Sequence, residues 1–155
     1  MKKITPREMT WINKGNIKNL SYNRFEAKGR NSYFLAVSDE NFEVSNTVSL
    51  NSRNYSFIVS ITERSYFSLN IGDSLSVTTS INNYKSETNI DNKYIDNKAT
   101  IEIKLVRVSN SFSLYIDNVF ISEATLPSSK EAISFGYYFN NSEFIKVTDF
   151  LYIKK

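Results

Sequence analysis

The chain has 155 residues, of which 41% are hydrophobic and 14% aromatic, and this is enough apolar material for one packed domain. Its formal net charge of +3 comes from 19 basic and 16 acidic residues spread along the sequence, which disfavours nucleic-acid binding because that function normally needs a concentrated basic surface. The sequence contains no cysteine and no histidine, which excludes disulfides, thiolate metal sites and catalytic triads with an imidazole base.

Neither a signal peptide nor a membrane-spanning helix is indicated. The first residues, "MKKITPREMTW", contain two lysines with no apolar stretch behind them. No window approaches the roughly 18 consecutive apolar residues of a membrane span. We therefore expect no membrane insertion, and we expect Met1 to be the true start of the protein.

Most of the chain alternates between apolar and polar residues, as half-buried β-strands do. The first 31 residues are the least clearly patterned, with one strand expected around Trp11 and another near Phe25. From about residue 32 onward, strands are expected in "NYSFIVSIT" (54–62), "SYFSLNI" (65–71), "SLSVTTSI" (74–81), "ATIEIKL" (99–105), "AISFGYYF" (132–139) and "IKVTDFLYI" (145–153). Runs of this length, separated by polar breaks, predict a β-sandwich or barrel.

The turns must be built largely from Asn, Asp and Ser, because the chain has only four Gly and two Pro. The stretch "SFSLYIDNVFIS" (111–122) predicts a hairpin in which Asp117 and Asn118 occupy the two positive-φ positions of a type I′ turn. The segment 81–100 is poor in apolar residues, and it is expected to be a long loop or a loop with a short edge strand.

Two details of the strand pattern need interpretation. In "IEIKLVRVS" the apolar residues up to Leu105 fall on one face of the strand, whereas Val106 and Val108 fall on the other. This indicates either a β-bulge after Leu105 or a strand covered on both faces, and we favour the bulge. In the last run, Leu151 and Ile153 are expected to share a face with Ile145 and Val147.

Several of these elements stand in an order that resembles the concanavalin A-like lectin/glucanase domains, which include the laminin G-like modules. The resemblance covers about residues 45–155 and rests on "NYSFIVSITERSYFSLNIGDSLSVTTSI", "ATIEIKLVRVSNSFSLYIDNVFISEATLP", "AISFGYYFNN" and "FIKVTDFLYIKK". Asn118 departs from the Gly that is usual in that hairpin, although Asn adopts the same geometry. The resemblance implies an all-β fold, an antiparallel two-sheet jelly-roll sandwich. Together with the chain length it predicts a single domain over residues 1–155, in which 1–31 are the least clearly assigned part.

Members of this family bind glycans, hydrolyse them, or serve as adhesion and structural modules. The hydrolases resemble one another in a Glu-x-Asp-x-(x-)Glu strand, which is absent here. The nearest cluster, "SDENFE", contains Asp39, Glu40 and Glu43, and we interpret it as a solvated loop. We therefore expect no enzymatic activity, with glycoside hydrolysis as the one weak alternative.

No cofactor or metal site is predicted. Loop residues that could supply oxygen ligands for Ca²⁺ are Asp91, Asn92, Asp96 and Asn97, or Asp39 with Glu40. Neither group has the spacing of an EF-hand, so a polar surface loop is the favoured interpretation.

Glycan-binding sites place aromatic rings beside polar hydrogen-bonding groups. Because side chains alternate between the two faces of a strand, the sequence indicates which tyrosines share a face with small or polar residues. The candidate ligand-binding residues are Tyr66, Tyr115, Asp117, Tyr138, Asn140 and Trp11, with Tyr84 and Tyr94 as further candidates in loops. The competing interpretation, which the single Trp favours, is that these tyrosines pack under loops or form a subunit interface.

These observations together predict a non-catalytic, lectin-like module that is a structural or attachment component of an extracellular assembly, in particular a capsid- or tail-associated protein of a bacteriophage virion. Abundant Asn and Ile, with more Lys than Arg, fit AT-rich coding. The alternative is a glycan-binding module of a secreted or surface bacterial protein. The expected partners are other protein subunits, surface glycans or both, and the expected location is a virion, the extracellular space or a cell surface.

Overall fold

The alternating apolar residues form antiparallel strands in the computed structural model, which describes residues 10–13, 16–129 and 131–155. The strands are β1 (Thr10–Asn13), β2 (Asn16–Lys18), β3 (Phe25–Val37), β4 (Asn41–Ser49), β5 (Tyr55–Thr62), β6 (Ser65–Ile71), β7 (Leu75–Ile81), β8 (Tyr84–Ile90), β9 (Thr100–Val108), β10 (Ser111–Ile116), β11 (Val119–Thr125) and β12 (Ile133–Lys154). A 3-10 turn, η2 (Asn92–Tyr94), precedes β9. In these ranges no helix has the length and hydropathy needed to cross a bilayer.

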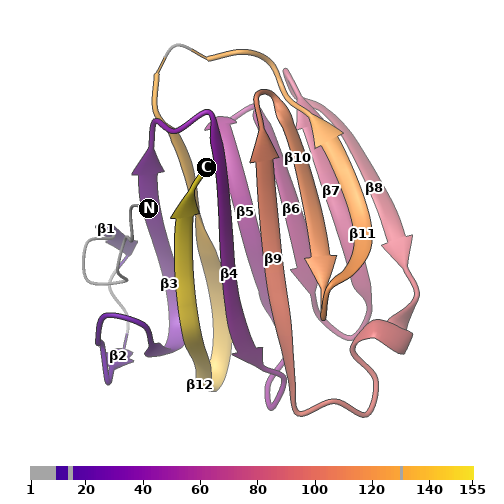
Figure 1. Cartoon of the computed structure of the whole chain (residues 1–155). Helices are drawn as coiled ribbons and strands as arrows, with labels where there is room; N and C mark the ends of the chain where they lie inside the picture. The colour runs from indigo at the N-terminus through magenta and orange to yellow at the C-terminus, as the bar shows by residue number, and fades with distance from the viewer. Residues whose placement is uncertain (1–9, 14–15, 130) are drawn as a thin grey trace.

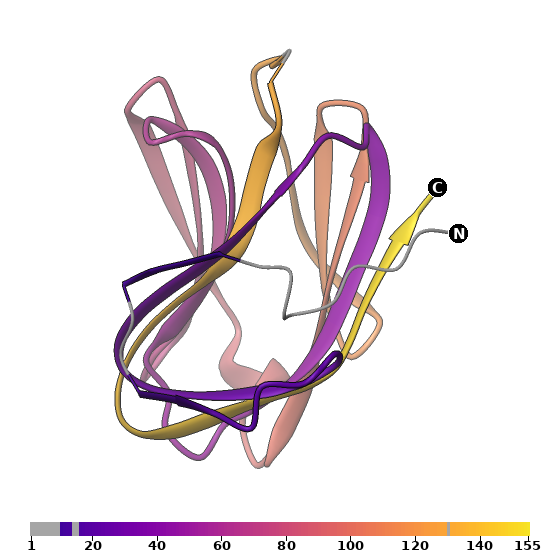
Figure 2. The same ribbon diagram turned by 90° about the vertical axis from the view of Figure 1, so that its left-hand side faces the viewer.

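The strands form two layers that share β12, and the expected all-β fold is confirmed (Figure 1). Residues 134–139 of β12 pair with β5, so this half of β12 belongs to the back layer with β5, β6, β7 and β8. Residues 147–154 pair with β4, so the other half belongs to the front layer with β4, β9, β10 and β11. β3 pairs with β12 along both halves, and Figure 2 shows the two long strands curving from one layer to the other.

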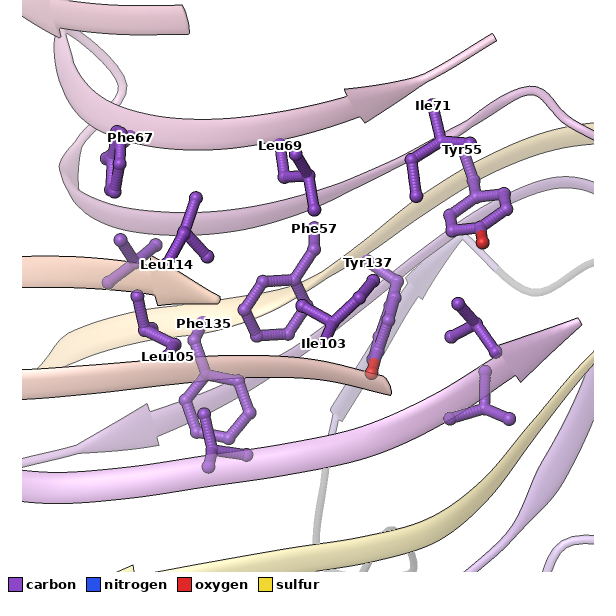
Figure 3. Close-up of a cluster of buried hydrophobic side chains, with 14 of the residues drawn as sticks. Tyr55, Phe57, Phe67, Leu69, Ile71, Ile103, Leu105, Leu114, Phe135 and Tyr137 are labelled. Carbon is purple, nitrogen blue, oxygen red and sulfur yellow. The ribbon is translucent and has the colours of Figure 1, made fainter. Parts of the chain in front are cut away.

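The core lies between the layers and is rich in aromatic side chains. Figure 3 shows Phe57, Leu69 and Tyr137 of the back layer opposite residues of β9 and β10. The Phe135 ring lies 6.2 Å from both Phe42 of the front layer and Phe57 of the back layer, so it connects the two. Pairs of this kind contribute beyond the area that they bury.

The expected use of Asn, Asp and Ser in turns is confirmed. In the described chain the non-glycine residues with positive φ are Asn19, Asn82, Asn83, Asn97, Ser109, Asp117, Asn118 and Asp149. Short polar side chains tolerate this conformation because they hydrogen-bond to nearby backbone. The hairpin of β10 and β11 turns at Asp117 and Asn118, whose φ angles are 48° and 63°, in agreement with the predicted two-residue turn.

Other expectations for the outer strands also hold. β1 and β3 include the strands expected around Trp11 and near Phe25. Residues 81–100 form the loop with a short edge strand, since β8 pairs with β7 and is followed by η2. β8 is exposed from Tyr84 to Asn89, which explains its low apolar content.

The prediction of a β-bulge after Leu105 is wrong. β9 pairs with β4 and β10 without a shift of register, and Arg107 occupies the inward position with only 6% of its surface exposed. Its guanidinium donates from Nε to the Ser109 carbonyl at 2.7 Å and from Nη1 to the Asp39 carbonyl at 2.8 Å. An inward arginine is tolerated because the strand ends there and backbone carbonyls are within reach.

The face assignment in the last run is also wrong. Asp149 has a φ of 53°, and the register with β4 shifts between Thr148 and Leu151. As a result Phe150 and Tyr152 continue the buried row, whereas Leu151 and Ile153 are only half-buried. The extra residue of this bulge reverses the parity of every position that follows it.

The buried amide of Asn46 has no hydrogen-bond partner among the described residues. Asn46 of β4 is 1% exposed, and neither its Oδ1 nor its Nδ2 makes a hydrogen bond. It lies in the inward row of β4 between Val44 and Val48. Burying an unbonded amide reduces stability, because the group loses its hydrogen bonds to water.

We therefore predict that Asn46→Leu increases the free energy of unfolding by about 1–3 kcal/mol, since leucine has a similar shape and needs no hydrogen bond. Urea denaturation followed by tryptophan fluorescence measures the change. Asn70→Leu is the matched control, because the Asn70 amide is fully hydrogen-bonded, and this variant is expected to lose stability. A loss of stability in Asn46→Leu would contradict the prediction.

The carboxylate of Asp117 ties the hairpin to β9. It accepts hydrogen bonds from the Glu102 backbone N–H at 2.9 Å and from the Lys98 ammonium at 2.7 Å. Burial raises the pKa of this carboxyl, but the two hydrogen bonds and the Lys98 charge outweigh burial and lower the pKa below its usual value. A lowered pKa in the folded state means that the ionised form stabilises the fold, and that this contribution is lost as the pH falls.

We expect Asp117→Asn to be less stable than the parent at neutral pH, and the difference in free energy of unfolding to shrink as the pH falls below about 4. Asparagine keeps the positive φ of the turn and removes only the charge. Denaturation of both proteins between pH 2 and pH 7 tests this. A difference that stays constant with pH would show that ionisation of Asp117 does not stabilise the hairpin.

Candidate functional site

The outward side of the back layer carries a continuous polar surface. Because paired residues of antiparallel strands point to the same side, the register places Ile58, Ser68 and Thr78 in one row across β5, β6 and β7. We call this surface the serine-rich face; on these three strands it consists of Ser56, Ile58, Ser60, Tyr66, Ser68, Asn70, Ser76, Thr78 and Ser80. The alternate residues of the same strands point into the core.

The serine-rich face contains a shallow hollow of about 450 Å³. Its lining residues are Ile58, Ser60, Glu63, Tyr66, Ser68, Asn70 and Thr78. Glu63 comes from the turn between β5 and β6, and it is the one charged side chain among these residues. The hollow therefore combines one aromatic ring and one aliphatic side chain with hydroxyl and amide groups.

Asn70 is the centre of the hydrogen bonding in the hollow. Its Oδ1 accepts from the hydroxyls of Ser56 and Ser68, both at 3.0 Å. Its Nδ2 donates to Ser76 Oγ at 3.2 Å and to Thr78 Oγ1 at 2.9 Å. These four bonds use both lone pairs and both hydrogens of the amide, and they join three neighbouring strands.

This network fixes what each hydroxyl offers to a ligand. Ser56 and Ser68 donate their hydrogens to Asn70, so their oxygens remain as acceptors. Ser76 and Thr78 accept from Asn70, so their hydrogens remain available for donation. Of these four hydroxyls, Ser68 and Thr78 line the hollow, so the network leaves an acceptor there on β6 and a donor on β7.

Two of the predicted tyrosines lie on this face. Tyr66 lines the hollow, and Tyr138 of β12 pairs with Ser56 in the row that contains Asn70. Strand geometry separates the Cα atoms of the two tyrosines by roughly 9–10 Å across two strands and roughly 13–14 Å along them. Asn140 is exposed two residues beyond Tyr138, and its backbone N–H donates to the Asn54 carbonyl at 3.1 Å.

The remaining candidates lie elsewhere. Tyr115 is on the outward side of the front layer, where its ring contacts Phe120 edge-on and lies 4.9 Å from the Lys104 ammonium. Asp117 is at the tip of that layer's hairpin, so neither residue can share a site with Tyr66. Trp11 lies in β1, and its side chain is outside the described part of the structure.

The two further tyrosine candidates are also apart from the hollow. Tyr84 begins β8 and is 85% exposed. Tyr94 lies in η2, half-buried, with the Lys93 ammonium 5.2 Å from its ring.

The acidic cluster of Asp39, Glu40 and Glu43 is only in part the solvated loop that the sequence predicts. Glu43 lies in β4, half-buried, and its carboxylate is 3.6 Å from the Lys104 ammonium and 3.3 Å from the Lys155 ammonium. Glu40 is exposed, as expected of a solvated loop. Asp39 is instead half-buried, accepts a hydrogen bond from the Tyr152 hydroxyl at 2.6 Å, and lies 3.6 Å from the Lys154 ammonium. Burial, together with the bond to Asp39, raises the pKa of Tyr152. Asp39 therefore joins the start of β4 to β12.

The loop residues considered for Ca²⁺ have roles in holding the loop. The carboxylate of Asp91 accepts from the Lys93 backbone N–H, and the Asn92 side chain accepts from the Leu75 N–H. Asp96 lies 3.9 Å from Arg53. Across the part of the chain that is described, no three or more Asp or Glu residues are grouped as a metal site requires.

Sequence reasoning identified Tyr66 but not the network beside it. A signal for the network was present in the residues that alternate with the core positions of each strand. In β5 these are Ser56, Ile58 and Ser60, which lie on the opposite face from the buried residues. Which hydroxyls reach Asn70 depends on the register between β5, β6 and β7, and a single sequence does not specify that register.

No protein-family model and no curated protein matches the sequence. Solved structures match the fold. A functionally unknown protein from Saccharomyces cerevisiae has a TM-score of 0.74 and 12% identity, over 97% of this chain and 98% of that one. The CBM2 module of an evolved Dit of Lactobacillus casei BL23 phage J-1 has a TM-score of 0.61 and 11% identity, over 97% and 92% of the two chains.

A third similar structure is the carbohydrate binding module CBM66 from Bacillus subtilis, with a TM-score of 0.55 and 16% identity over 94% of this chain and 91% of that one. At these identities the likeness concerns the fold. The chain is a β-sandwich and shares its fold with these modules.

Proposed function

We propose that this protein is a non-catalytic, concanavalin A-like module that binds a glycan in the hollow of the serine-rich face. The observation that carries the proposal is the Asn70 network beside Tyr66. Sugar hydroxyls both donate and accept hydrogen bonds, and in the hollow the network leaves an oriented acceptor at Ser68 and a donor at Thr78. The Tyr66 ring supplies an apolar surface on which a sugar ring can stack.

The charge of the hollow favours a neutral glycan. Glu63 is the one charged residue of the described lining and lies at the turn, where it would repel an acidic sugar. The hydroxyls near Asn70 are already oriented by the protein, so binding requires little ordering of side chains. An open hollow of this kind fits an internal segment of a polysaccharide chain better than a small, enclosed ligand.

The same residues argue against hydrolysis. Glycoside hydrolases of both stereochemical classes use a pair of carboxyl groups that flank the scissile bond. The described lining of the hollow supplies one carboxylate, Glu63, and no second acid to act with it. Recognition without bond cleavage is the function that this arrangement supports.

We further propose that the module acts as an attachment component of an extracellular assembly, in particular a bacteriophage particle. The likeness to the module of phage J-1 Dit supports this, because it extends over nearly the whole of both chains. The prevalence of Lys over Arg and the abundance of Asn agree with AT-rich coding, which is compatible with a phage gene. A secreted or surface-located bacterial binding module is the alternative.

We expect Tyr66→Ala to weaken binding of the preferred neutral polysaccharide roughly tenfold or more, because the stacking surface is lost. A glycan array identifies the ligand, and isothermal titration calorimetry then measures its affinity. Tyr115→Ala, a matched substitution on the other layer, is expected to leave the affinity unchanged. Equal effects of both variants, or no saturable binding by the parent, would contradict the proposed site.

We also expect no release of reducing sugar from the polysaccharides that the protein binds. Prolonged incubation followed by a reducing-end assay measures this. Product that appears with the parent and disappears with Glu63→Gln would show that the hollow is catalytic.

A further inference from the structure

A second pocket of about 350 Å³ lies at one end of the front layer, away from the serine-rich face. Its described lining residues are Glu40, Arg107, Ser109, Asn110, Ser128 and Ser129. They come from the turn before β4, the end of β9, the turn between β9 and β10, and the connection from β11 to β12, which meet at the top of Figure 1. All six lining side chains are polar, so the pocket does not suit an apolar ligand.

The walls of this pocket are held together by hydrogen bonds. The Ser109 backbone N–H donates to the Glu40 carbonyl at 3.0 Å, which joins the turn before β4 to the turn after β9. The Asn110 amide donates to Ser128 Oγ at 2.8 Å, and the Leu126 N–H donates to the Asn110 carbonyl at 2.9 Å. These bonds fix the three connections that surround the pocket, so the site exists before a ligand arrives.

Arg107 is the fixed donor of the pocket. Its guanidinium is held by the carbonyls of Ser109 and Asp39 and lies 5.5 Å from the Phe112 ring. Those two bonds use Nε and Nη1, and no described residue accepts from Nη2, although Arg107 lines the pocket. A smaller polar residue would be enough to hydrogen-bond to the carbonyls at this strand end. A buried arginine whose Nη2 group has no acceptor among the described residues therefore suggests that a ligand accepts from it.

The charges in the pocket restrict the class of ligand. Arg107 repels a metal cation, while Glu40 in the same lining repels a free anion. A neutral molecule with adjacent hydroxyls satisfies both, because a carboxylate accepts from two hydroxyls and a guanidinium donates to their oxygens. The hydroxyls and amide of the remaining lining residues can both donate and accept.

We propose that this end pocket is a second, independent binding site, and that its ligand is a single neutral sugar unit at the end of a glycan. The ligand's adjacent hydroxyls bind Glu40 and Arg107. The pocket is distinct from the hollow on the serine-rich face, which is open and fits the interior of a glycan chain. A module with both sites can bind one glycan by its end and another along its length, which raises the avidity for a dense glycan surface.

The test is an NMR titration of the ¹⁵N-labelled chain with neutral methyl glycosides of glucose, galactose, mannose, fructose and rhamnose. We expect saturable shifts of the backbone amides of Ser109, Asn110 and Ser129 and of the Arg107 Nε–H signal with at least one glycoside. Glu40→Gln should reduce the affinity roughly tenfold or more, because one charged hydrogen-bond acceptor is lost. Glu40 is exposed, so this variant is expected to fold.

Glu63→Gln is the matched control, since it removes a carboxylate from the hollow and should leave the end pocket unchanged. Tyr66→Ala separates the two proposals: the end pocket still binds its glycoside when the hollow is disabled. No saturable shift with any of these glycosides would overturn the proposal. Binding that persists in Glu40→Gln would overturn it also, as would shifts produced by glucuronate, phosphate or Ca²⁺ alone.

Discussion

The packing of the inward side chains of β12 between the two layers is the interaction on which the rest of the structure depends. Phe135 contacts Phe42 of the front layer and Phe57 of the back layer, and Tyr152 stacks on Phe42 from the far end of the same strand. Because β12 pairs with β5 at one end and β4 at the other, the same strand also supplies backbone hydrogen bonds to both layers. Hydrophobic burial and sheet pairing therefore stabilise the same arrangement.

Both proposed binding sites depend on this arrangement. The pairing of β12 with β5 fixes which residues of the back layer face outward, and the register onward to β7 brings four hydroxyls to Asn70. The contact of Asp39 with Tyr152 holds the turn before β4 against β12, and the same turn supplies Glu40 to the end pocket. The packed core thus fixes the positions of polar groups at the surface, as is usual when a rigid scaffold carries functional residues.

The sequence predicts the fold more fully than the sites, for physical reasons. Alternation of apolar residues and the Asp117-Asn118 turn depend on neighbours in the chain, so strands and the hairpin could be predicted locally. The bulge at Asp149 and the inward position of Arg107 depend on carbonyls and strands that are distant in sequence, and both were predicted incorrectly. Parity placed Tyr66 on a polar face, whereas the hydroxyl network around Asn70 needed the register of three strands.

The order of the strands along the chain also constrains how the molecule forms. β3, β4 and β5 precede β12 by many residues in the chain, yet each of them pairs with it. Until β12 pairs, the inner faces of the two layers have no shared strand to hold them together, and the apolar rows of β4 and β5 remain without their central partner. Closure of the sandwich therefore has to wait for β12, and the period before β12 pairs is when the apolar faces of the other strands are most exposed to aggregation.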